Sequence, residues 1–573
     1  MNLNKKGLKM QKHFYTNERN HQILIALLKE HNIKKVVASP GTANSVFVGS
    51  IQNDPFFQIY SSVDERSAAY IACGLSLESG EPVVISCTGA TAARNYMSGA
   101  TEAYYSKLPL IILTSSQPSN RNGHLFAQVT DRTSPPKDVC KLTLTLPLVK
   151  SKDEEWECEI NANRALLEVN RNGGGPVHIN LITSYSYNEQ TALTQQYLPE
   201  VRKISRYNRC SELPNMAKGR IGIFVGSHKP WTSKQVTAIE KFCETNNAVV
   251  FCDHTSNYYG KYKINYPLAI NQAPINKANI PAYKVELLVH IGEVSGEEGA
   301  MRMIRGDETW RVSPDGEIRD TFRNITCVFE MCEEEFFNSY IKENINNTEY
   351  YQECILNYEK LKSCLPSQLA QMPFSNVWIA GLTSKHIPSG STVVLSILNT
   401  LRVWNYSEFL DGINVFCPVG GFGIDGAMSL MLGASLNNAS KLCYCITGDL
   451  AFFYDLNSIG NRYLRSNVRI MVINNGCGVE FKKSYAMAYR LLEDEVAPYV
   501  AAAGHFGNKS TALVKHYAED LGFEYLSANN KSDFEIALKK FTAEEITEKP
   551  ILLEVFVDAN DEVEALNIIH NRK

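Results

Sequence analysis

Two polar clusters follow apolar runs in the last third of the chain, and their residue types are those that bind a cation together with phosphate. Gly448-Asp449 follows the apolar run 443–446, and Asn474-Asn475-Gly476 follows the run 470–473. In a parallel α/β sheet, the carboxyl ends of neighbouring strands open onto one crevice, where ligands bind. The carboxylate and the amide oxygen are therefore expected to face the same site. Hard oxygen ligands of this kind suit Mg²⁺ that carries phosphate groups.

The spacing agrees with this prediction, although a simpler interpretation exists. Asp449 and Asn475 lie 26 positions apart (475 − 449), which is enough for one helix and one strand. Gly448 would let the backbone approach a phosphate closely, and a helix that starts there would direct its first N–H groups toward it. The alternative is that Gly-Asp and Asn-Asn-Gly are turn residues, which these residue types favour.

The composition is that of a globular protein with several domains. The chain has 573 residues, 44% of them hydrophobic, and a net charge of −4. This length predicts about three domains, and the charge indicates neither a nucleic-acid nor a membrane-surface partner. The basic N-terminus is not followed by an apolar stretch, so we expect no secretory signal and a cytoplasmic location. The fifteen cysteines lack paired zinc-type spacing and are interpreted as reduced.

Alternating strand and helix patterns predict the α/β class and three segments. These are 10–190, 205–360 and 370–573, and each is expected to be a Rossmann-like domain with a parallel sheet. The middle segment lacks a convincing GxGxxG, so a nucleotide site of its own is weakly supported. Residues 338–362 are polar with a helical pattern and are interpreted as a linker.

The stretch 448–476, GDLAFFYDLNSIGNRYLRSNVRIMVINNG, resembles the signature of thiamine-diphosphate (ThDP) enzymes. The resemblance implies thiamine diphosphate and Mg²⁺ as cofactors. It also implies that Asp449, Asn475 and the carbonyl of Cys477 bind the metal. The three predicted segments would then be the pyrimidine-binding, central and diphosphate-binding domains of this fold, in that order.

A second element of the resemblance is an acid in the first segment. The stretch VDERSAAYIACGL places Glu65 where ThDP enzymes carry their catalytic glutamate. The resemblance implies that Glu65 hydrogen-bonds the aminopyrimidine and promotes removal of the proton from the reactive carbon. A carboxylate in the first turn of a helix is also favoured by the helix dipole, and this does not conflict with the functional role.

Several shorter motifs narrow the resemblance to one group of ThDP enzymes. SPGTANS, TGATAARNY, EAYYSKLPLIILT and GIDGAMS resemble the SEPHCHC synthases of the menaquinone pathway, which decarboxylate 2-oxoglutarate and add the product to isochorismate. Three arginines of that family are replaced here by Ala43, Gln117 and Val419. Guanidinium groups are suited to binding carboxylates, so their loss predicts different substrates.

The resemblance implies a site spread over both outer segments. His124 and Gln128 join Glu65 as candidate catalytic residues, although His124 is equally interpreted as an ordinary loop residue. The candidate substrate-binding residues are Gln117, Arg132, Arg402 and Glu480. Either arginine could bind a substrate carboxylate in place of the missing family arginines. The implied cofactor-binding residues are Ser39, Pro40, Gly41, Thr42, Thr88, Gly89, Asn95, Asn399, Thr400, Gly423, Ile424, Asp425, Gly448, Asp449, Leu450, Asn475, Cys477 and Gly478.

These features together predict a ThDP- and Mg²⁺-dependent 2-oxo acid decarboxylase or carboligase, which acts through a cofactor-bound enamine. Its partners would be a small 2-oxo acid and, for a carboligase, a carbonyl or alkene acceptor. Domains of different subunits face each other in this family, so a homodimer or homotetramer is implied. The alternatives are a genuine SEPHCHC synthase, a flavin-containing relative of acetolactate synthase, and a ThDP-binding protein without catalysis.

Overall fold

The computed structural model describes residues 14–216, 218–271, 283–343, 345–505 and 509–570. Contacts divide the chain into two compact units. Unit 1 is the chain up to Tyr207 together with Glu317–Val328, and unit 2 is Asn208–Gly316 together with the chain from Phe329 onward. The boundaries 10–190, 205–360 and 370–573 stay a prediction, since most of the second and third segments lies in one unit.

Unit 1 is built on a sheet of six parallel strands in the order β3-β2-β4-β5-β7-β6. Its central strands β4 and β5 are almost entirely buried, as continuous apolar runs require when both faces of a sheet are covered. A short antiparallel ribbon, β1 with β8, lies beside it. The strands are β1 Tyr15–Thr16, β2 Lys35–Ala38, β3 Gln58–Ser61, β4 Val83–Thr88, β5 Leu110–Ser116, β6 Leu142–Leu146, β7 Val177–Ile182 and β8 Leu193–Gln195.

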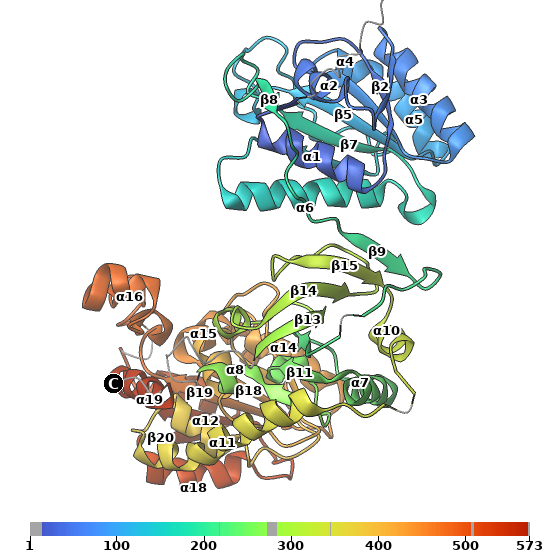
Figure 1. The fold of residues 1–573 in the computed structure, drawn as a ribbon. Helices are drawn as coiled ribbons and strands as arrows, with labels where there is room; N and C mark the ends of the chain where they lie inside the picture. The colour runs from blue at the N-terminus through green and yellow to red at the C-terminus, as the bar shows by residue number, and fades with distance from the viewer. Residues whose placement is uncertain (1–13, 217, 272–282, 344, 506–508, 571–573) are drawn as a thin grey trace, which may run out of the picture. The chain divides into compact units, whose positions relative to one another are not determined.

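Helices cover both faces of this sheet, as Figure 1 shows. On one face α1, α2 and α6 pack aliphatic side chains against the strands, and on the other α3, α4 and α5 pack mainly alanines. The small side chains let α3 and α5 approach closely, and a Cβ at Gly99 would lie 2.5 Å from that of Ala69. The helices are α1 Arg19–Glu30, α2 Ser45–Ile51, α3 Glu65–Ser79, α4 Ala92–Asn95, α5 Met97–Tyr105 and α6 Lys152–Glu168.

Unit 2 contains two further parallel sheets. In the first, β12, β11, β10, β13 and β14 are neighbours in that order, and in the second the order is β17-β16-β18-β19-β21-β20. The strands of unit 2 are β10 Ile221–Val225, β11 Ala248–Cys252, β12 Lys263–Asn265, β13 Lys284–Ile291, β14 Arg305–Val312, β16 Thr392–Leu395, β17 Asn414–Phe416, β18 Cys443–Gly448, β19 Val468–Asn474, β20 Glu524–Ala528 and β21 Ile551–Phe556. The strands β9 Ser205–Asn208 and β15 Ile325–Glu330 each cross a boundary between the units. Three parallel sheets with helices between the strands confirm the predicted fold class.

One helix of unit 2 lies largely in the segment 338–362 that was interpreted as a linker. Helix α11 (Glu349–Gln371) buries Tyr350, Cys354 and Tyr358 and contacts β11, α12 and α19. It is therefore a packed part of unit 2 rather than a spacer. The others are α7 Ser233–Asn246, α8 Tyr266–Asn271, α9 Glu298–Met301, α10 Glu333–Ser339, α12 Asn376–Thr383, α13 Asn399–Trp404, α14 Ala427–Asn437, α15 Asp449–Tyr454, α16 Met487–Leu492, α17 Leu513–Asp520, α18 Lys531–Phe541 and α19 Ala559–Ile569.

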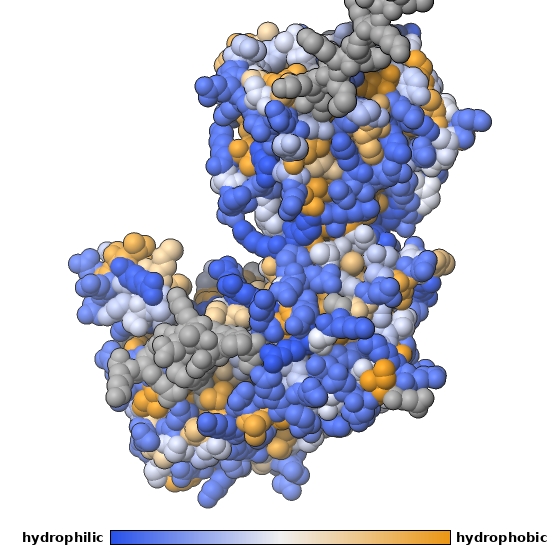
Figure 2. All heavy atoms as spheres, in the orientation of Figure 1, coloured by the Kyte–Doolittle hydropathy of each residue, from blue (hydrophilic) through white to orange (hydrophobic). Residues whose placement is uncertain are grey.

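Apolar atoms gather on α16, where the exposed fractions of Met487 and Leu491 are 76% and 72% (Figure 2). Within the described ranges, no helix combines the length and the apolar character that crossing a bilayer requires.

Candidate functional site

The strand pair β18–β19 brings the first predicted residues together in unit 2. These strands are parallel neighbours, and Gly448 at the end of β18 pairs with Ile473 near the end of β19. Asp449 and Asn475 each follow directly after one of these strands. Their side chains therefore start from the same edge of the sheet, as the sequence predicts.

Asp449 is a buried carboxylate whose charge is only partly compensated. Its exposed fraction is 2%, and Oδ2 has no hydrogen-bond partner in the described part of the chain. Burial raises the pKa of Asp449 to about 7, although backbone N–H groups of Leu450 and Gly476 act in the opposite direction. A cation beside Oδ2 would supply the missing compensation, because a buried charge is costly unless it is paired. The residues present therefore fit a divalent metal ion.

The loop after β19 offers the remaining oxygen ligands. The side-chain oxygen of Asn475 accepts one hydrogen bond, from the backbone N–H of Cys477 at 3.3 Å. Gly476 adopts a left-handed φ of 74°, which turns the chain back toward the β18 end. On the other strand, a Cβ at Gly448 would meet no atom within 4 Å. The space above Gly448 is therefore open, as a bound diphosphate would require.

Other predicted cofactor residues of unit 2 lie at the starts of helices or in the turns before them. Asn399 and Thr400 begin α13, and the side-chain oxygen of Asn399 is buried without a hydrogen-bond partner among the described residues. Gly423, Ile424 and Asp425 lie in the turn before α14. In this turn Ile424 is half-buried and Asp425 is exposed. Gly478 donates its backbone N–H to the Ala501 carbonyl at 2.6 Å.

In unit 1, Glu65 is the first residue of α3. Asp64 caps this helix, because its carboxylate accepts from the backbone N–H groups of Arg66 and Ser67. The side chain of Glu65 is half-buried, and its Oε2 accepts a hydrogen bond from Asn95 Nδ2 at 3.1 Å. This hydrogen bond therefore joins the predicted catalytic residue Glu65 to the predicted cofactor-binding residue Asn95.

The other predicted cofactor residues of unit 1 lie at the carboxyl edge of its sheet. Residues 39–42 follow β2. Thr88 is the last residue of the neighbouring strand β4, and Gly89 directly follows it. The two loops touch, since a Cβ at Gly41 would lie 2.9 Å from the Thr88 Cβ. Ser39 and Pro40 precede this contact, and Thr42 follows it.

Comparison with known proteins shows to which family this chain belongs. Residues 19–134 match the family model "Thiamine pyrophosphate enzyme, N-terminal TPP binding domain". A protein of Bacteroides thetaiotaomicron, named 2-succinyl-5-enolpyruvyl-6-hydroxy-3-cyclohexene-1-carboxylate synthase, is 30% identical over 96% of this chain and 98% of its own. The chain belongs to the thiamine pyrophosphate enzyme family. Relatives with the same name from Phocaeicola vulgatus and Flavobacterium psychrophilum are 29% and 26% identical, over 95% and 93% of this chain and 96% and 97% of theirs.

The two arginines proposed as carboxylate clamps of this thiamine pyrophosphate enzyme have different environments. Arg402 Nη1 lies 2.6 Å from Glu480 Oε1, so these two predicted substrate residues neutralise each other. Lys483 Nζ lies 2.7 Å from Glu480 Oε2, and only 3% of its side chain is exposed. Sequence reasoning missed Lys483, although a lysine three residues after a glutamate is a recognisable helical spacing.

Two further buried acids of this family member were also missed. Burial raises the pKa of Glu297 to about 8, and Asn405 Nδ2 donates to its Oε1 at 3.1 Å. Burial likewise raises the pKa of Glu562 to about 7, and the backbone N–H of Asn376 donates to it at 3.1 Å. No local sequence pattern marks them, because buried carboxylates are rare and are stabilised by residues distant in sequence.

The loop after β5 carries the remaining predicted residues of the enzyme. Gln117 is buried and joined to this loop, with its Nε2 donating to the Ala127 carbonyl at 3.1 Å and its Oε1 accepting from Arg121 at 2.6 Å. Gln128 is exposed and accepts from the Tyr185 hydroxyl at 3.0 Å. His124 is exposed as well, so nothing in unit 1 favours a catalytic role over that of a loop residue.

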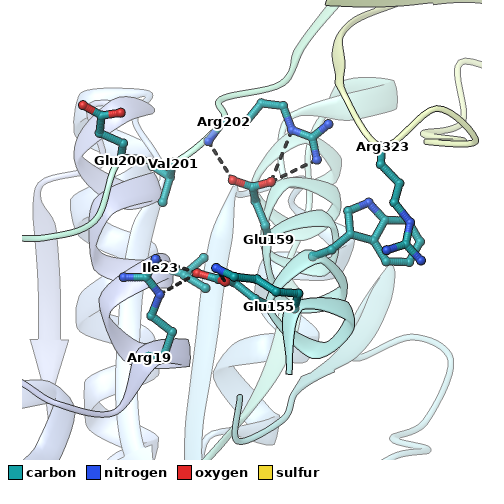
Figure 3. A pocket seen from close by; sticks show the side chains of 10 residues that line it. Arg19, Ile23, Glu155, Glu159, Glu200, Val201, Arg202 and Arg323 are labelled. Carbon is teal, nitrogen blue, oxygen red and sulfur yellow. Dashed lines mark hydrogen bonds and ion pairs between the residues drawn. The ribbon is translucent and has the colours of Figure 1, made fainter. Parts of the chain in front are cut away.

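A cavity of about 410 Å³ in unit 1 lies apart from these residues. Figure 3 shows its lining, which comes mainly from α1 and α6. Its cations are already paired, because Arg19 donates to Glu155 at 2.7 Å and Arg202 donates to Glu159 at 2.9 Å. None of the predicted site residues lines this cavity, and we do not assign it to the reaction.

Proposed function

We propose that this protein is a ThDP- and Mg²⁺-dependent enzyme that breaks or forms a carbon–carbon bond next to the carbonyl of a 2-oxo acid. The observation that carries the proposal is the buried, incompletely compensated carboxylate of Asp449 beside Asn475 at one sheet edge. Membership of the family supports the cofactor. The predicted cytoplasmic location remains part of this proposal.

In this proposal the chain divides the work between its two units. Asp449, Asn475 and the carbonyl of Cys477 would hold Mg²⁺ and, through it, the diphosphate. When bound, the cofactor supplies an electron sink for the bond broken at the carbonyl carbon. Asn95 fixes Glu65 through its Oε2, which leaves Oε1 available to hydrogen-bond the aminopyrimidine. Glu65 would thereby hold the proton that it shares with the aminopyrimidine.

We further propose that the substrates differ from those of SEPHCHC synthases. At two of the three positions where SEPHCHC synthases carry an arginine, the structure has the apolar side chains of Ala43 and Val419, which are 3% and 4% exposed. At the third, Gln117 is occupied by hydrogen bonds within its own loop. Such an environment disfavours two dicarboxylic substrates, because it supplies no charge to replace their hydration. A genuine SEPHCHC synthase is the alternative.

A homodimer is the assembly that we propose. Helix α3, which starts at Glu65, exposes Tyr70, Ile71 and Leu77, and α14 exposes Leu430 and Leu436. Apolar side chains gathered on one helix commonly mark a protein interface. A second copy of the chain would cover them and exclude water from the cofactor, so we expect size-exclusion chromatography with light scattering to give twice the mass of the chain.

The test is a panel of 2-oxo acids incubated with protein, ThDP and Mg²⁺ while CO₂ release is followed. Glu65→Gln should abolish release and leave ThDP affinity within about threefold, because only the proton-holding group is changed. The matched control is Glu78→Gln, which alters an exposed glutamate on the same helix. Normal turnover by Glu65→Gln, or no ThDP binding by the wild type, would contradict the proposal.

A further inference from the structure

We propose that Arg132 is the residue that binds the carboxylate of the 2-oxo acid, an inference that rests on the proposed function. Arg132 lies in the loop after β5. Its guanidinium is held by two neutral groups of unit 1. Nε donates to Asn180 Oδ1 on β7 at 3.3 Å, and Nη1 donates to Thr130 Oγ1 at 3.1 Å. The side chain is therefore positioned before any ligand arrives.

The position of this guanidinium relates it to the cofactor residues of unit 1. A Cβ at Gly89 would lie 3.0 Å from Arg132 Nη1 and 3.2 Å from its Cζ. Gly89 directly follows Thr88, the last residue of β4, whose side chain borders Gly41, so the guanidinium lies at the same carboxyl edge of the sheet. The absence of a side chain at Gly89 is what allows the guanidinium to lie there.

Arg132 is also a cation without an anionic partner. It is half-buried, and it takes part in no ion pair with a described carboxylate. Its neighbour Asp131 interacts with it electrostatically but forms no ion pair with it, and that carboxylate accepts from the backbone N–H and the hydroxyl of Thr133 at 2.9 and 2.7 Å. Burial lowers the pKa of Arg132, and the nearby Arg94 acts in the same direction. An unpaired, partly buried guanidinium is costly, and an anionic ligand would offset this cost.

The environment of Arg402 excludes it from the same task in the described structure. Glu480 and Lys483 form a closed cluster with it, so a substrate carboxylate would have to displace the Glu480 carboxylate. Among the described residues Arg132 has no such competitor, and its Nη2 forms no hydrogen bond with them. This free edge of one guanidinium fits one carboxylate, which points to a 2-oxo acid with a single carboxylate.

The test uses the ThDP- and Mg²⁺-loaded protein and two unreactive probes, oxamate, which mimics a short 2-oxo acid, and its neutral analogue oxamide. Calorimetry should show that Arg132→Gln weakens oxamate binding by about 10- to 100-fold and leaves the binding of oxamide and ThDP unchanged, because a charge-assisted hydrogen bond is lost. Arg132→Lys should recover part of the affinity. The matched control is Lys137→Gln, which removes an exposed positive charge five residues away.

Kinetics with the best donor of the panel gives a second measurement. In Arg132→Gln the KM should rise by a similar factor while kcat stays within about threefold, because a contact made in the ground state raises KM alone. Unchanged oxamate affinity in Arg132→Gln, or no oxamate binding by the loaded wild type, would overturn the role of Arg132. Failure of the wild type to take up ThDP would instead overturn the proposed function.

Discussion

The buried carboxylate of Asp449 leads to an unusual prediction about stability. Replacing Asp449 by Asn should stabilise the metal-free protein and at the same time remove its Mg²⁺-dependent binding of ThDP. The physical reason is that Oδ2 is buried without a hydrogen-bond partner in the described chain, so its charge is a cost that only a bound cation offsets.

The pKa gives the magnitude and the sign of this effect. The folded-state pKa of Asp449 is raised from 3.8 to about 7, and a shift of about three units corresponds to about 4 kcal/mol. Because the folded-state value is the higher one, the cost is absent below about pH 4, grows up to about pH 7 and is constant above it. The buried amide of Asn carries its own desolvation penalty, so we expect a net gain of about 1–3 kcal/mol.

Urea denaturation of the metal-free wild type and Asp449→Asn at about pH 5 and about pH 8 measures this difference, which should be larger at the higher pH. Glu297→Gln is a matched control, because burial also raises the pKa of Glu297, to about 8, yet this residue lies outside the metal loop. That control should show the same direction of pH dependence and keep its affinity for ThDP. Equal or lower stability of Asp449→Asn at about pH 8 would refute the reasoning.

The remaining predictions concern the cofactor loop and the charged cluster near it. Gly448→Ala should lower ThDP affinity at least about tenfold, because its Cβ would enter open space above the strand end, while the extended backbone at φ −81° accepts alanine without strain. A titration with ThDP and Mg²⁺ checks this, and unchanged affinity would show that the diphosphate does not lie there. Arg402→Gln should lower the free energy of unfolding by about 1–3 kcal/mol in urea denaturation, because Glu480 keeps only one of its two cations. A stability equal to that of the wild type would contradict this assignment.

The sequence correctly placed Asp449 and Asn475 at one sheet edge because the signals for this placement are local. Asp449 and Asn475 each follow an apolar run directly, and neighbouring parallel strands align their ends. The fold class was predictable for the same reason, since the central strands β18 and β19 beside the site are short buried runs. The cofactor and substrate roles themselves stay predictions until ligands are measured.

Contacts that depend on distant parts of the chain could not be predicted from local sequence patterns. Arg402 and Glu480 are 78 positions apart, so their pairing follows only from the folded structure. The burial of Glu297 and Glu562 depends in the same way on residues far along the chain. Helix α11 was interpreted as a linker because its polar face dominates its composition, whereas three buried side chains on its other face fix it to unit 2.

The division of the chain into two units has an evolutionary consequence. The oxygen ligands proposed for the metal lie in unit 2, whereas Arg132 and its two anchoring residues lie in unit 1. In the proposed function, a substitution in the loop after β5 would change which 2-oxo acid is accepted while Asp449 and Asn475 keep their positions in unit 2. Substrate recognition and diphosphate binding would then be open to separate change, whereas Glu65 ties the handling of the aminopyrimidine to unit 1.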